Sequence, residues 1–524
     1  MNTLEILDCS LRDGGYINNW NFKEDVIKDI IAKLVNANID LIEIGFLRDC
    51  EFDPNRTLFN NCKEIEHILP KSRKQSKFVA MALHNLYDIN KLEKYDGKTI
   101  EYIRVTFHDY DIEEGLQYIV KVKEKGYKVF CNPINIMGYS DEKILEIIKK
   151  VNIIKPYAFS IVDTFGSMEK KDLIRIYSLC NNNLDSDIVI GIHLHENLNS
   201  SFALMQDFIQ IKDAKRKHTC DGSLFGIGRV PGNLCIELLA NYLNKNFDYY
   251  YDIDYLLDAI DAHIIKLKKI EEWGYSIAYA LSAKYNLHRN YSEFLLKKGN
   301  LSSKQINYIL SQIENFKKTA FDKKYIEKLY LDFQNRHIND SENLIIAKNI
   351  FSGKNILLLA PGITLNEYSD EINAYIRDFK PVVVALNFYT DKFKVDYSFF
   401  SNENRYSFFL NKIKEETVII TSNIENPLFK HLTFDYYNLA ITNGKLNDSC
   451  VLMFLKLLSQ LEIKEFSIAG FDGVDENSYY DDTLSVNLKK YDFEKIQADT
   501  RSFLDHMQHK MKINFLTPSA YEFK

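Results

Sequence analysis

The protein has 524 residues, which is too long for a single hydrophobic core and predicts two or three domains. Hydrophobic residues make up 46% and charged residues 27% of the chain, as in ordinary globular proteins, and a net charge of -7 argues against a nucleic-acid surface. We expect no membrane partner, because the apolar runs are too short to cross a bilayer and the first residues lack a signal pattern. Eight cysteines without CxxC spacing predict a reducing, cytoplasmic location.

Short apolar runs typical of buried strands recur through residues 1–290, and segments with the apolar spacing of amphipathic helices separate them. The first run opens the stretch EILDCSLRDGGY at 5–16, and seven more lie at 40–45, 78–83, 102–106, 128–132, 158–163, 188–193 and 218–222. Eight strand–helix units predict an α/β fold, a (β/α)8 TIM barrel, with a doubly wound sheet as the alternative. In such a barrel the chemistry lies on the loops that follow the strands.

Polar residues that are able to bind a metal or take part in catalysis follow the first, seventh and eighth of these runs. Arg12 and Asp13 precede two glycines, which we expect to let the chain turn sharply and approach a ligand. A lone Arg–Asp pair is more often a surface ion pair. His193 and His195, however, are two residues apart at a strand end, so both side chains point the same way. A glycine-rich loop after the eighth run ends in Asn233, which can add an amide oxygen.

One carboxylate, two imidazoles and one amide from one face of a barrel form a set of mixed oxygen and nitrogen ligands. Such a set suits a divalent ion, with Mn2+ expected first and Mg2+, Co2+ or Zn2+ as alternatives. A two-His-one-carboxylate set also describes the non-haem iron oxygenases. Those enzymes are usually built on an all-β scaffold, so we rank that interpretation lower.

Five motifs follow one another along the first 290 residues: LRDGG at 11–15, IEIGF at 42–46, VDTFGSM at 162–168, HLH at 193–195 and GIGRVPGN at 226–233. Their order resembles that of the DRE-TIM metallolyase superfamily, which is HMG-CoA lyase-like. The superfamily contains the hydroxymethylglutaryl-CoA lyases, the isopropylmalate synthases and the 4-hydroxy-2-oxovalerate aldolases. The resemblance covers about 1–290, and 273–276 (WGYS) and the DGSLFGIG run are most similar to the oxovalerate-type pyruvate aldolases.

This resemblance implies a role for each matching residue of the metal site. Asp13, His193 and His195 would bind the metal, with Asn233 as a fourth ligand. Arg12 would lie against the oxygen of the substrate enolate.

The resemblance also implies a substrate site, with one departure from the family. Thr164 matches a position whose backbone helps to hold the pyruvate carboxylate, and Tyr275 matches a tyrosine that lines the aldehyde site. The family's aldolases carry a catalytic histidine three residues after the metal aspartate, where this chain has Tyr16. Tyrosine, with an ordinary pKa of about 10, is a poor base at neutral pH. The general base is therefore open between Tyr16, His84, His108 and a water on the metal.

The function expected from these features is a divalent-metal-dependent aldolase. It would cleave or form a 4-hydroxy-2-oxo acid through a pyruvate enolate, with a 2-oxo acid and an aldehyde as small-molecule partners. One alternative is a Claisen-type acyl-CoA-condensing synthase or lyase on the same barrel, and another is a non-catalytic metal-bound scaffold. Glu43 and Arg104 point inward on the second and fourth strands and would either orient the site or pair structurally. The sequence leaves open whether the protein forms a homo-oligomer.

The second half of the chain predicts a helical extension and a further α/β domain. Residues 291–350 are charged and helical, with helices at 304–316 and 324–335 and serines at 302 and 303 that can cap the first of them. Residues 351–524 predict a Rossmann-like domain with a parallel sheet, and they resemble the sialyltransferase-like and pterin-diphosphokinase-like domains. Its predicted strands lie at 355–360, 381–388, 396–400, 417–421 and 465–469, with a helix at 448–460.

The first turn of this second domain suggests a ligand. The turn at 360–364 follows the first strand and leads into a helix, so it can hold an anion at the helix N-terminus, although an ordinary strand-to-helix turn is the simpler interpretation. The resemblance implies a nucleotide or nucleotide-sugar as the occupant. Asp472 and Arg405 are the first residues to test.

Overall fold

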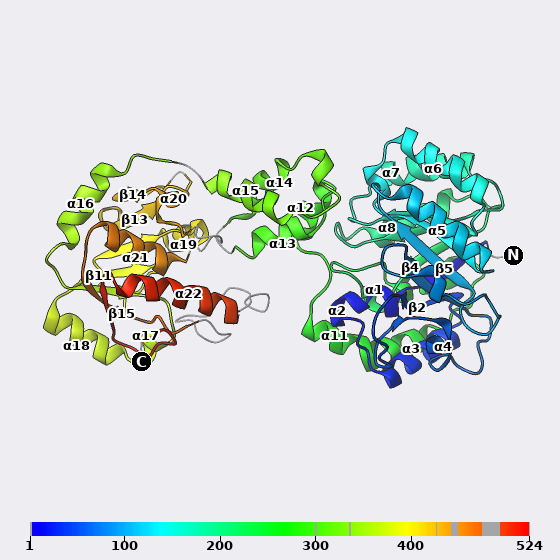
Figure 1. Ribbon diagram of the computed structural model, residues 1–524, viewed down its shortest axis with the longest axis horizontal. Coiled ribbons are helices and arrows are strands. Elements are labelled where there is room, and N and C mark those ends of the chain that lie inside the picture. The colour runs from blue at the N-terminus through cyan, green and yellow to red at the C-terminus, as the bar shows by residue number, and fades with distance from the viewer. Residues whose placement is uncertain are drawn as a thin grey trace. The chain divides into compact units, whose positions relative to one another are not determined.

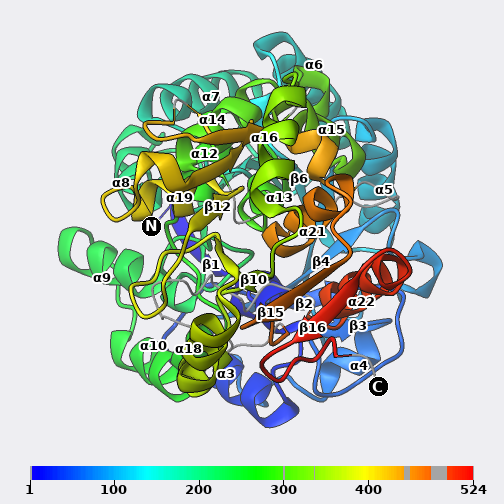
Figure 2. The same cartoon turned by 90° about the vertical axis from the view of Figure 1, so that its left-hand side faces the viewer.

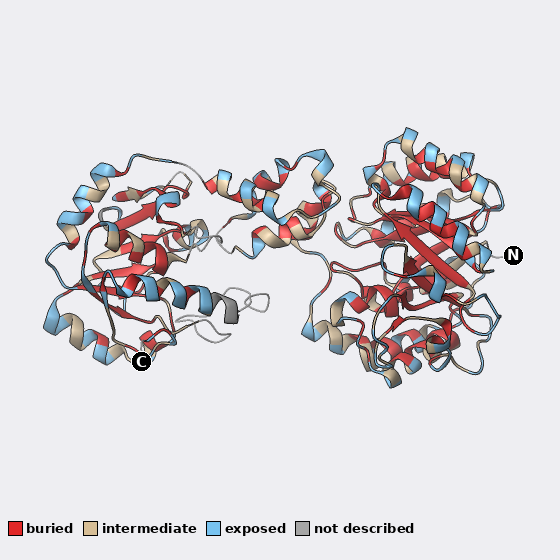
Figure 3. Ribbon diagram, in the orientation of Figure 1, coloured by how far each residue is buried: buried red, intermediate tan, exposed pale blue. Residues whose placement is uncertain are grey.

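The computed structural model of the protein describes residues 3–298, 301–334, 337–425, 427–441, 449–473 and 493–522. The chain divides into two compact units, one of Met1–Asn290 with Glu314–Phe321 and one of Tyr291–Ile313 with Asp322–Lys524. In both units the strands are mostly buried, and the helices turn exposed residues outward (Figure 3). Among the helices within the described ranges, none combines the length and the apolar character needed to span a membrane.

The first unit is a closed barrel of eight parallel strands. β1 pairs with β9 on one side and with β2 on the other, which closes the ring, and the short β3 (Leu58–Phe59) pairs with β2 outside it. The predicted barrel is therefore confirmed, and each predicted strand lies within two residues of an observed one. The eight strands are β1 (Leu4–Asp8), β2 (Leu41–Leu47), β4 (Lys77–Leu83), β5 (Tyr102–Phe107), β6 (Lys128–Pro133), β7 (Ala158–Asp163), β8 (Val189–Leu194) and β9 (His218–Gly222).

Amphipathic helices surround this barrel. In α3, for example, Ile27, Ile30, Ile31 and Leu34 are buried at the three- and four-residue spacing of one helix face. Figure 1 shows α5, α6 and α7 outside the strands, in blue to blue-green. The helices of this unit after the first loop are α3 (Glu24–Asn36), α4 (Cys62–Glu66), α5 (Ile112–Glu124), α6 (Asp141–Ile154), α7 (Lys170–Asn183), α8 (Ser201–Ile211), α9 (Ile236–Asn246), α10 (Ile253–Ala259), α11 (Ile265–Ile270) and α12 (Ile277–Lys284).

The loop after β1 forms two short helical turns, α1 (Ser10–Asp13) and α2 (Gly15–Asn18). The glycines between them were expected to make a sharp turn, and that expectation is wrong, because Gly14 has helical angles of φ -60° and ψ -23°. Their role is close packing instead. A Cβ atom on Gly15 would lie 2.0 Å from the indole ring of Trp20. That indole donates a hydrogen bond of 2.8 Å from Nε1 to the carbonyl oxygen of Arg12, so the packing fixes the loop that carries Arg12 and Asp13.

Within the residues that the structure describes, the second unit contains a seven-stranded sheet in which all neighbouring strands run parallel. The strand order is β14-β13-β12-β11-β10-β15-β16, so the direction of progression reverses between β10 and β15 (Figure 2). The predicted parallel α/β arrangement is confirmed, and β14 and β16 were not predicted. The strands are β10 (Ile356–Leu359), β11 (Val382–Leu386), β12 (Tyr397–Phe400), β13 (Val418–Thr421), β14 (Leu432–Phe434), β15 (Glu465–Ala469) and β16 (Lys512–Phe515).

The helices that follow the barrel include the two predicted for the extension, although the first ends at Ser311 and not at the predicted residue 316. Ser302 caps α14 through a capping box with Gln305, which confirms the predicted cap. The predicted end of the next helix at 335 and the predicted start of a later helix at 448 lie outside the described residues. The helices are α13 (Asn290–Leu296), α14 (Ser303–Ser311), α15 (Lys323–Gln334), α16 (Ser341–Phe351), α17 (Thr364–Glu367), α18 (Ser369–Phe379), α19 (Glu403–Phe409), α20 (Tyr436–Leu439), α21 (Cys450–Gln460) and α22 (Phe493–Gln508).

The turn after β10 already holds an anion that belongs to the chain. The backbone N–H of Thr364 donates to Oδ2 of Asp472 at 2.9 Å, and the Thr364 hydroxyl donates to the same carboxylate. A Cβ atom on Gly362 would lie 2.4 Å from this carboxylate, so glycine is required there. The simpler interpretation of this turn fits the structure, because Asp472 satisfies the N–H that an external anion would use.

A buried and an exposed apolar residue of the barrel should contribute differently to its stability. Replacing the fully buried Phe159 of β7 by alanine should lower the stability of the barrel by about 3–5 kcal/mol, because it removes apolar contacts and leaves a cavity. Ile153→Ala on the surface of α6, where the side chain is 83% exposed, should change it by less than about 0.5 kcal/mol. Tryptophan fluorescence during urea unfolding measures this transition, because Trp20 and Trp273, the two tryptophans of the chain, both lie in the first unit. Equal effects of the two substitutions would contradict the assignment of Phe159 to the core.

Candidate metal centre

Asp13 is buried at the end of α1 and is held from three sides. Its Oδ1 accepts a hydrogen bond from the Arg12 guanidinium, and its Oδ2 accepts from Asn233 Nδ2 at 2.8 Å and from the Arg229 backbone N–H at 3.2 Å. Burial alone would raise the pKa of Asp13. The charge of Arg12, the nearby His195 and His193 and the Asn233 hydrogen bond outweigh burial and lower the pKa well below its usual range. Asp13 is therefore an anionic oxygen ligand at neutral pH.

His195 follows β8 and is oriented by the neighbouring strand. Its Nδ1 lies 2.9 Å from the carbonyl oxygen of Asp163 at the end of β7. A carbonyl oxygen can only accept, so Nδ1 carries the proton and Nε2 keeps its lone pair. That Nε2 lies 3.9 Å from Oδ2 of Asp13. Burial and the adjacent His193 lower the pKa of His195 to about 3, so the ring is neutral and able to bind a metal.

His193 lies on β8, directly opposite Asp221 of β9 in the strand register. Its Nδ1 is 3.2 Å from Oδ2 of Asp221, which is the arrangement that orients a ligand histidine through its second nitrogen. The His193 and His195 rings lie 4.8 Å apart between centroids at an angle of 82°. One ligand atom from each of Asp13, His193 and His195 lies within 4.8 Å of the others, so the three can hold one ion.

Asn233 reaches the same point from the loop after β9. A single antiparallel bridge pairs it with His195, and Glu196 N–H donates to the Gly232 carbonyl oxygen at 3.0 Å. Gly228 allows this approach, because a Cβ atom there would lie 2.5 Å from Oδ2 of Asp13. While Nδ2 of Asn233 donates to Asp13, its buried Oδ1 has no hydrogen-bond partner in the part of the chain that the structure describes.

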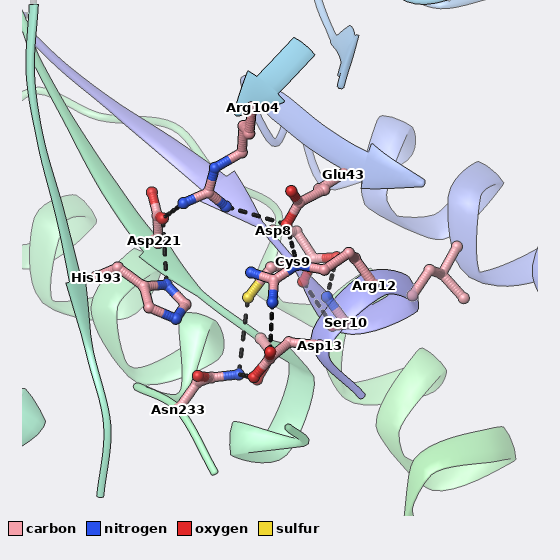
Figure 4. Close-up of polar contacts among 12 residues, drawn as sticks. Asp8, Cys9, Ser10, Arg12, Asp13, Glu43, Arg104, His193, Asp221 and Asn233 are labelled. Atoms are coloured by element: carbon pink, nitrogen blue, oxygen red, sulfur yellow. Dashed lines mark hydrogen bonds and ion pairs between the residues drawn. The ribbon is translucent and has the colours of Figure 1, made fainter. Parts of the chain in front are cut away.

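A chain of buried ion pairs lies beside these ligands (Figure 4). Glu43 Oε2 accepts from Arg12 Nε at 2.8 Å and from Arg104 Nη1 at 3.0 Å, and Arg104 also pairs with Asp221. The predicted inward orientation of Glu43 and Arg104 is confirmed, and the two residues pair with each other as well as with the groups around the ligands. Every member of this chain is at most 5% exposed.

The residues present fit a divalent cation. Leaving the two imidazoles aside, three carboxylates (Asp13, Glu43 and Asp221) and two guanidiniums (Arg12 and Arg104) give a net charge of -1 in a buried site. A divalent ion would bring this charge to +1 and give the orphaned amide oxygen of Asn233 a partner. The mixture of one carboxylate, two imidazoles and one amide suits Mn2+, Mg2+, Co2+ or Zn2+.

The three other predicted site residues are Tyr16, Thr164 and Tyr275. Tyr16 is half-exposed on α2, with its ring edge-on to Trp20 at 4.8 Å between centroids and the Arg229 guanidinium 5.8 Å from its centroid. Thr164 accepts a hydrogen bond of 2.7 Å from the Asn135 backbone N–H and borders a small cavity next to His195. Tyr275 is 59% exposed before α12. Their catalytic roles stay predictions.

The two histidines named as alternative bases follow neighbouring strands, β4 and β5, and share one partner. His84 Nε2 lies 2.9 Å and His108 Nδ1 3.8 Å from Oδ2 of Asp111. His108 also stacks on Tyr110, with 4.8 Å between ring centroids. Burial lowers the pKa of His108, which keeps it neutral and able to accept a proton.

Two groups of residues that contribute to the site were not predicted from the sequence. Asp221 was seen only as part of a loop motif, although its position opposite His193 follows from aligning β8 with β9 and would have revealed it. His288 and Arg289 carried no local signal, because only the folded chain brings the segment after α12 to Arg229 and Val230.

Asp221 gives a test of the metal centre that leaves all proposed ligands in place. Asp221→Asn removes the charge that orients His193 and balances Arg104, and we expect Mn2+ affinity to fall about 10–100-fold. Isothermal titration calorimetry on the full chain measures the affinity. Asp207→Asn, which breaks a surface ion pair with Lys170, is the matched control and should bind Mn2+ as the parent does. Identical affinities for the two variants would contradict the orienting role of Asp221.

Comparison with known proteins finds several that are similar to this barrel. A 4-hydroxy-2-oxovalerate aldolase of Bacillus cereus is 25% identical over 257 residues, which cover 48% of this chain and 72% of the relative. An oxaloacetate decarboxylase of Mycobacterium tuberculosis is 23% identical over 48% of this chain and 74% of its own length. The crystal structure of the N-terminal domain of a proposed aldolase from Bacteroides vulgatus aligns with a TM-score of 0.49 and 22% identity, over 56% of this chain and 96% of that domain. The barrel of this chain matches the HMGL-like family from residue 3 to residue 262.

Proposed function

We propose that the barrel is a divalent-metal-dependent carbon–carbon lyase of the aldolase type, which cleaves or forms a 4-hydroxy-2-oxo acid through a pyruvate enolate. The observation that carries the proposal is the buried Arg12 guanidinium, which contacts the ligand Asp13 and is therefore positioned beside any substrate on the metal. Such a pairing of cation and metal site suits a reaction in which negative charge develops on an oxygen atom.

The chemistry of a 2-oxo acid matches these groups. A divalent ion held by Asp13, His193 and His195 would supply Lewis-acid polarisation of the keto group. Arg12 stabilises the charge that develops on the enolate oxygen, and Glu43 fixes the guanidinium in place through its bond to Nε. Because these charges are buried, their effect on the reacting atoms is stronger than it would be in water.

The bond changes are those of an aldol reaction. In cleavage, a base removes the proton of the 4-hydroxyl group, the C3–C4 bond breaks, an aldehyde leaves and the electron pair becomes the enolate, which takes a proton at C3 to give pyruvate. In the reverse direction C3 of the enolate attacks the aldehyde carbon, and the new alkoxide takes a proton. We keep Tyr16, Thr164 and Tyr275 as proposed site residues, with His84 and His108 as alternatives to Tyr16 for the base.

The relatives support this choice of reaction. The aldolases among them are named for a 4-hydroxy-2-oxo acid, and the decarboxylase is named for another 2-oxo acid. Both names describe cleavage of a carbon–carbon bond next to C3 of a 2-oxo acid. A shared pyruvate enolate would account for both.

For the second unit we propose a Rossmann-like domain that binds a nucleotide or nucleotide-sugar. The reversal of strand order between β10 and β15 supports this proposal, because parallel sheets bind ligands at the carboxyl ends of strands where the order reverses. Asp472 follows β15 at this point, and Arg405 lies on α19. The ligand there would have to bind without the N–H of Thr364, which Asp472 already occupies.

Proton exchange at C3 of pyruvate tests the proposed enolate. With the full chain and Mg2+, Mn2+ or Co2+ in D2O, we expect metal-dependent loss of the pyruvate methyl signal by NMR, after removal of the paramagnetic ions. Asp13→Ala should reduce exchange by about 100-fold or more, because it deletes a ligand and removes one of the ion-pair partners of Arg12. The control Glu146→Ala on α6 removes only exposed ion pairs and should exchange at the parent rate. Absence of exchange with every metal would refute the proposal, and a reaction with acetyl-CoA instead would support the Claisen-type alternative.

A further inference from the structure

The second unit has a large groove where the amino ends of neighbouring strands meet. Its volume is about 740 Å³, and small-molecule and cofactor sites have volumes of about 300–1,000 Å³. β12, β11 and β10 are neighbours in the sheet, and the segments that precede these three strands all border the groove. Because the strands are parallel, the groove lies at the opposite end of the sheet from the turn after β10.

One lysine borders the groove from each of these three segments. Lys354 and Lys380 lie two residues before β10 and β11, and Lys394 lies three residues before β12. The register aligns the starts of these strands, with Ile356 opposite Val382, so the three lysines gather at one edge of the sheet. All three are exposed, and none forms an ion pair in the part of the chain that the structure describes.

Positive charge exceeds negative charge around the groove. Arg377 adds a fourth cation, and its Nε lies 3.1 Å from Oδ1 of the adjacent Asp378. Asp396 also borders the groove, and its Oδ2 accepts a hydrogen bond of 2.9 Å from the Val383 N–H. Four cations against these two carboxylates give a net charge of +2, in a chain whose net charge is -7. The helix α18 ends beside the groove, and its dipole offsets only about half a charge.

Apolar side chains border the same groove. Ile350 comes from α16, Ile376 from α18 and Val382 from β11, and each of them is partly exposed. Tyr397 of β12 adds a partly exposed aromatic ring. A small inorganic anion would neutralise the lysines but leave this apolar surface in water, whereas a ligand with an apolar body would cover it.

We propose that this groove binds an organic phosphate, with two or more phosphate groups on an apolar body of about the size of a nucleoside. A lysine ammonium is a compact charge with three rotatable donors, so several lysines can surround the tetrahedral oxygens of phosphate groups. A ligand with one carboxylate would balance only one of the charges. The groove is separate from the nucleotide site proposed above, which lies at the carboxyl ends of the strands near Asp472.

Calorimetric titration of the full chain tests the proposal. ADP and UDP are the probes, adenosine and uridine are their neutral counterparts, and EDTA keeps metal ions from taking part. We expect at least one diphosphate to bind about tenfold or more tightly than its nucleoside, and more weakly as the salt concentration rises. Lys354→Gln combined with Lys394→Gln should lower that affinity about tenfold or more, because two charges that border the groove are lost. If neither diphosphate binds, or if each nucleoside binds as tightly as its diphosphate, the inference is wrong.

Two single substitutions show where a bound nucleotide lies. Lys412→Gln removes an exposed lysine of the same unit that does not border the groove, and it should leave the affinity unchanged. Arg405→Gln on α19 tests the site at the carboxyl ends of the strands and should leave binding at the groove unchanged. If Arg405→Gln abolishes binding and the paired lysine substitutions have no effect, the inference is overturned while the function proposed for the second unit stands.

Chemical labelling locates the ligand without any substitution. Acetic anhydride acetylates exposed lysines, and mass spectrometry of the resulting peptides reports the extent of reaction at each residue. In the free chain Lys354, Lys380, Lys394 and Lys412 should all react, because all four are exposed. Saturating ADP or UDP should protect the three lysines that border the groove and leave Lys412 reactive. Acetylation of those three that is unchanged by either nucleotide would overturn the inference.

Discussion

The buried carboxylate of Glu43 is the interaction on which the site depends. Its Oε2 accepts hydrogen bonds from Arg12 and from Arg104, and the side chain is fully shielded from water. Without this carboxylate Arg12 and Arg104 would each lose an ion-pair partner in the barrel interior, where breaking a buried ion pair costs about 3–5 kcal/mol. Through Arg104 the same carboxylate reaches Asp221 and then His193, so one side chain on β2 supports groups on β5, β9 and β8.

The ligand set and this chain of charges have complementary roles. Each imidazole presents one nitrogen inward because the other faces an oxygen atom of the chain, the carboxylate of Asp221 for His193 and the carbonyl of Asp163 for His195. Arg12 keeps Asp13 ionised in a place where burial alone would favour the protonated acid. The polarity of the barrel interior is therefore part of the chemistry of the site, and the apolar clusters between strands and helices provide the stability that supports it.

The sequence was sufficient for features that depend on short-range periodicity. The eight barrel strands were predicted because each is a buried apolar run between helical segments, and the common orientation of His193 and His195 follows from the two-residue repeat of a strand. β14 and β16 were missed because each has four residues or fewer and includes polar residues, so neither forms a clear apolar run. The role of the glycines in LRDGG was misjudged, since their importance comes from Trp20 packing against them. In the same way nothing local indicated that Asp472 would return to the turn after β10.

The chain of charges in the barrel also bears on how such a site can change over evolutionary time. Arg12, Glu43, Arg104 and Asp221 come from four separate segments of the sequence, yet each forms an ion pair with the next. Replacing one of them alone takes an ion-pair partner from a buried charge, whereas neighbours that are replaced together can keep the charges balanced. We therefore expect these positions to covary among homologues, so that they are inherited as one unit even where the loops around the metal diverge.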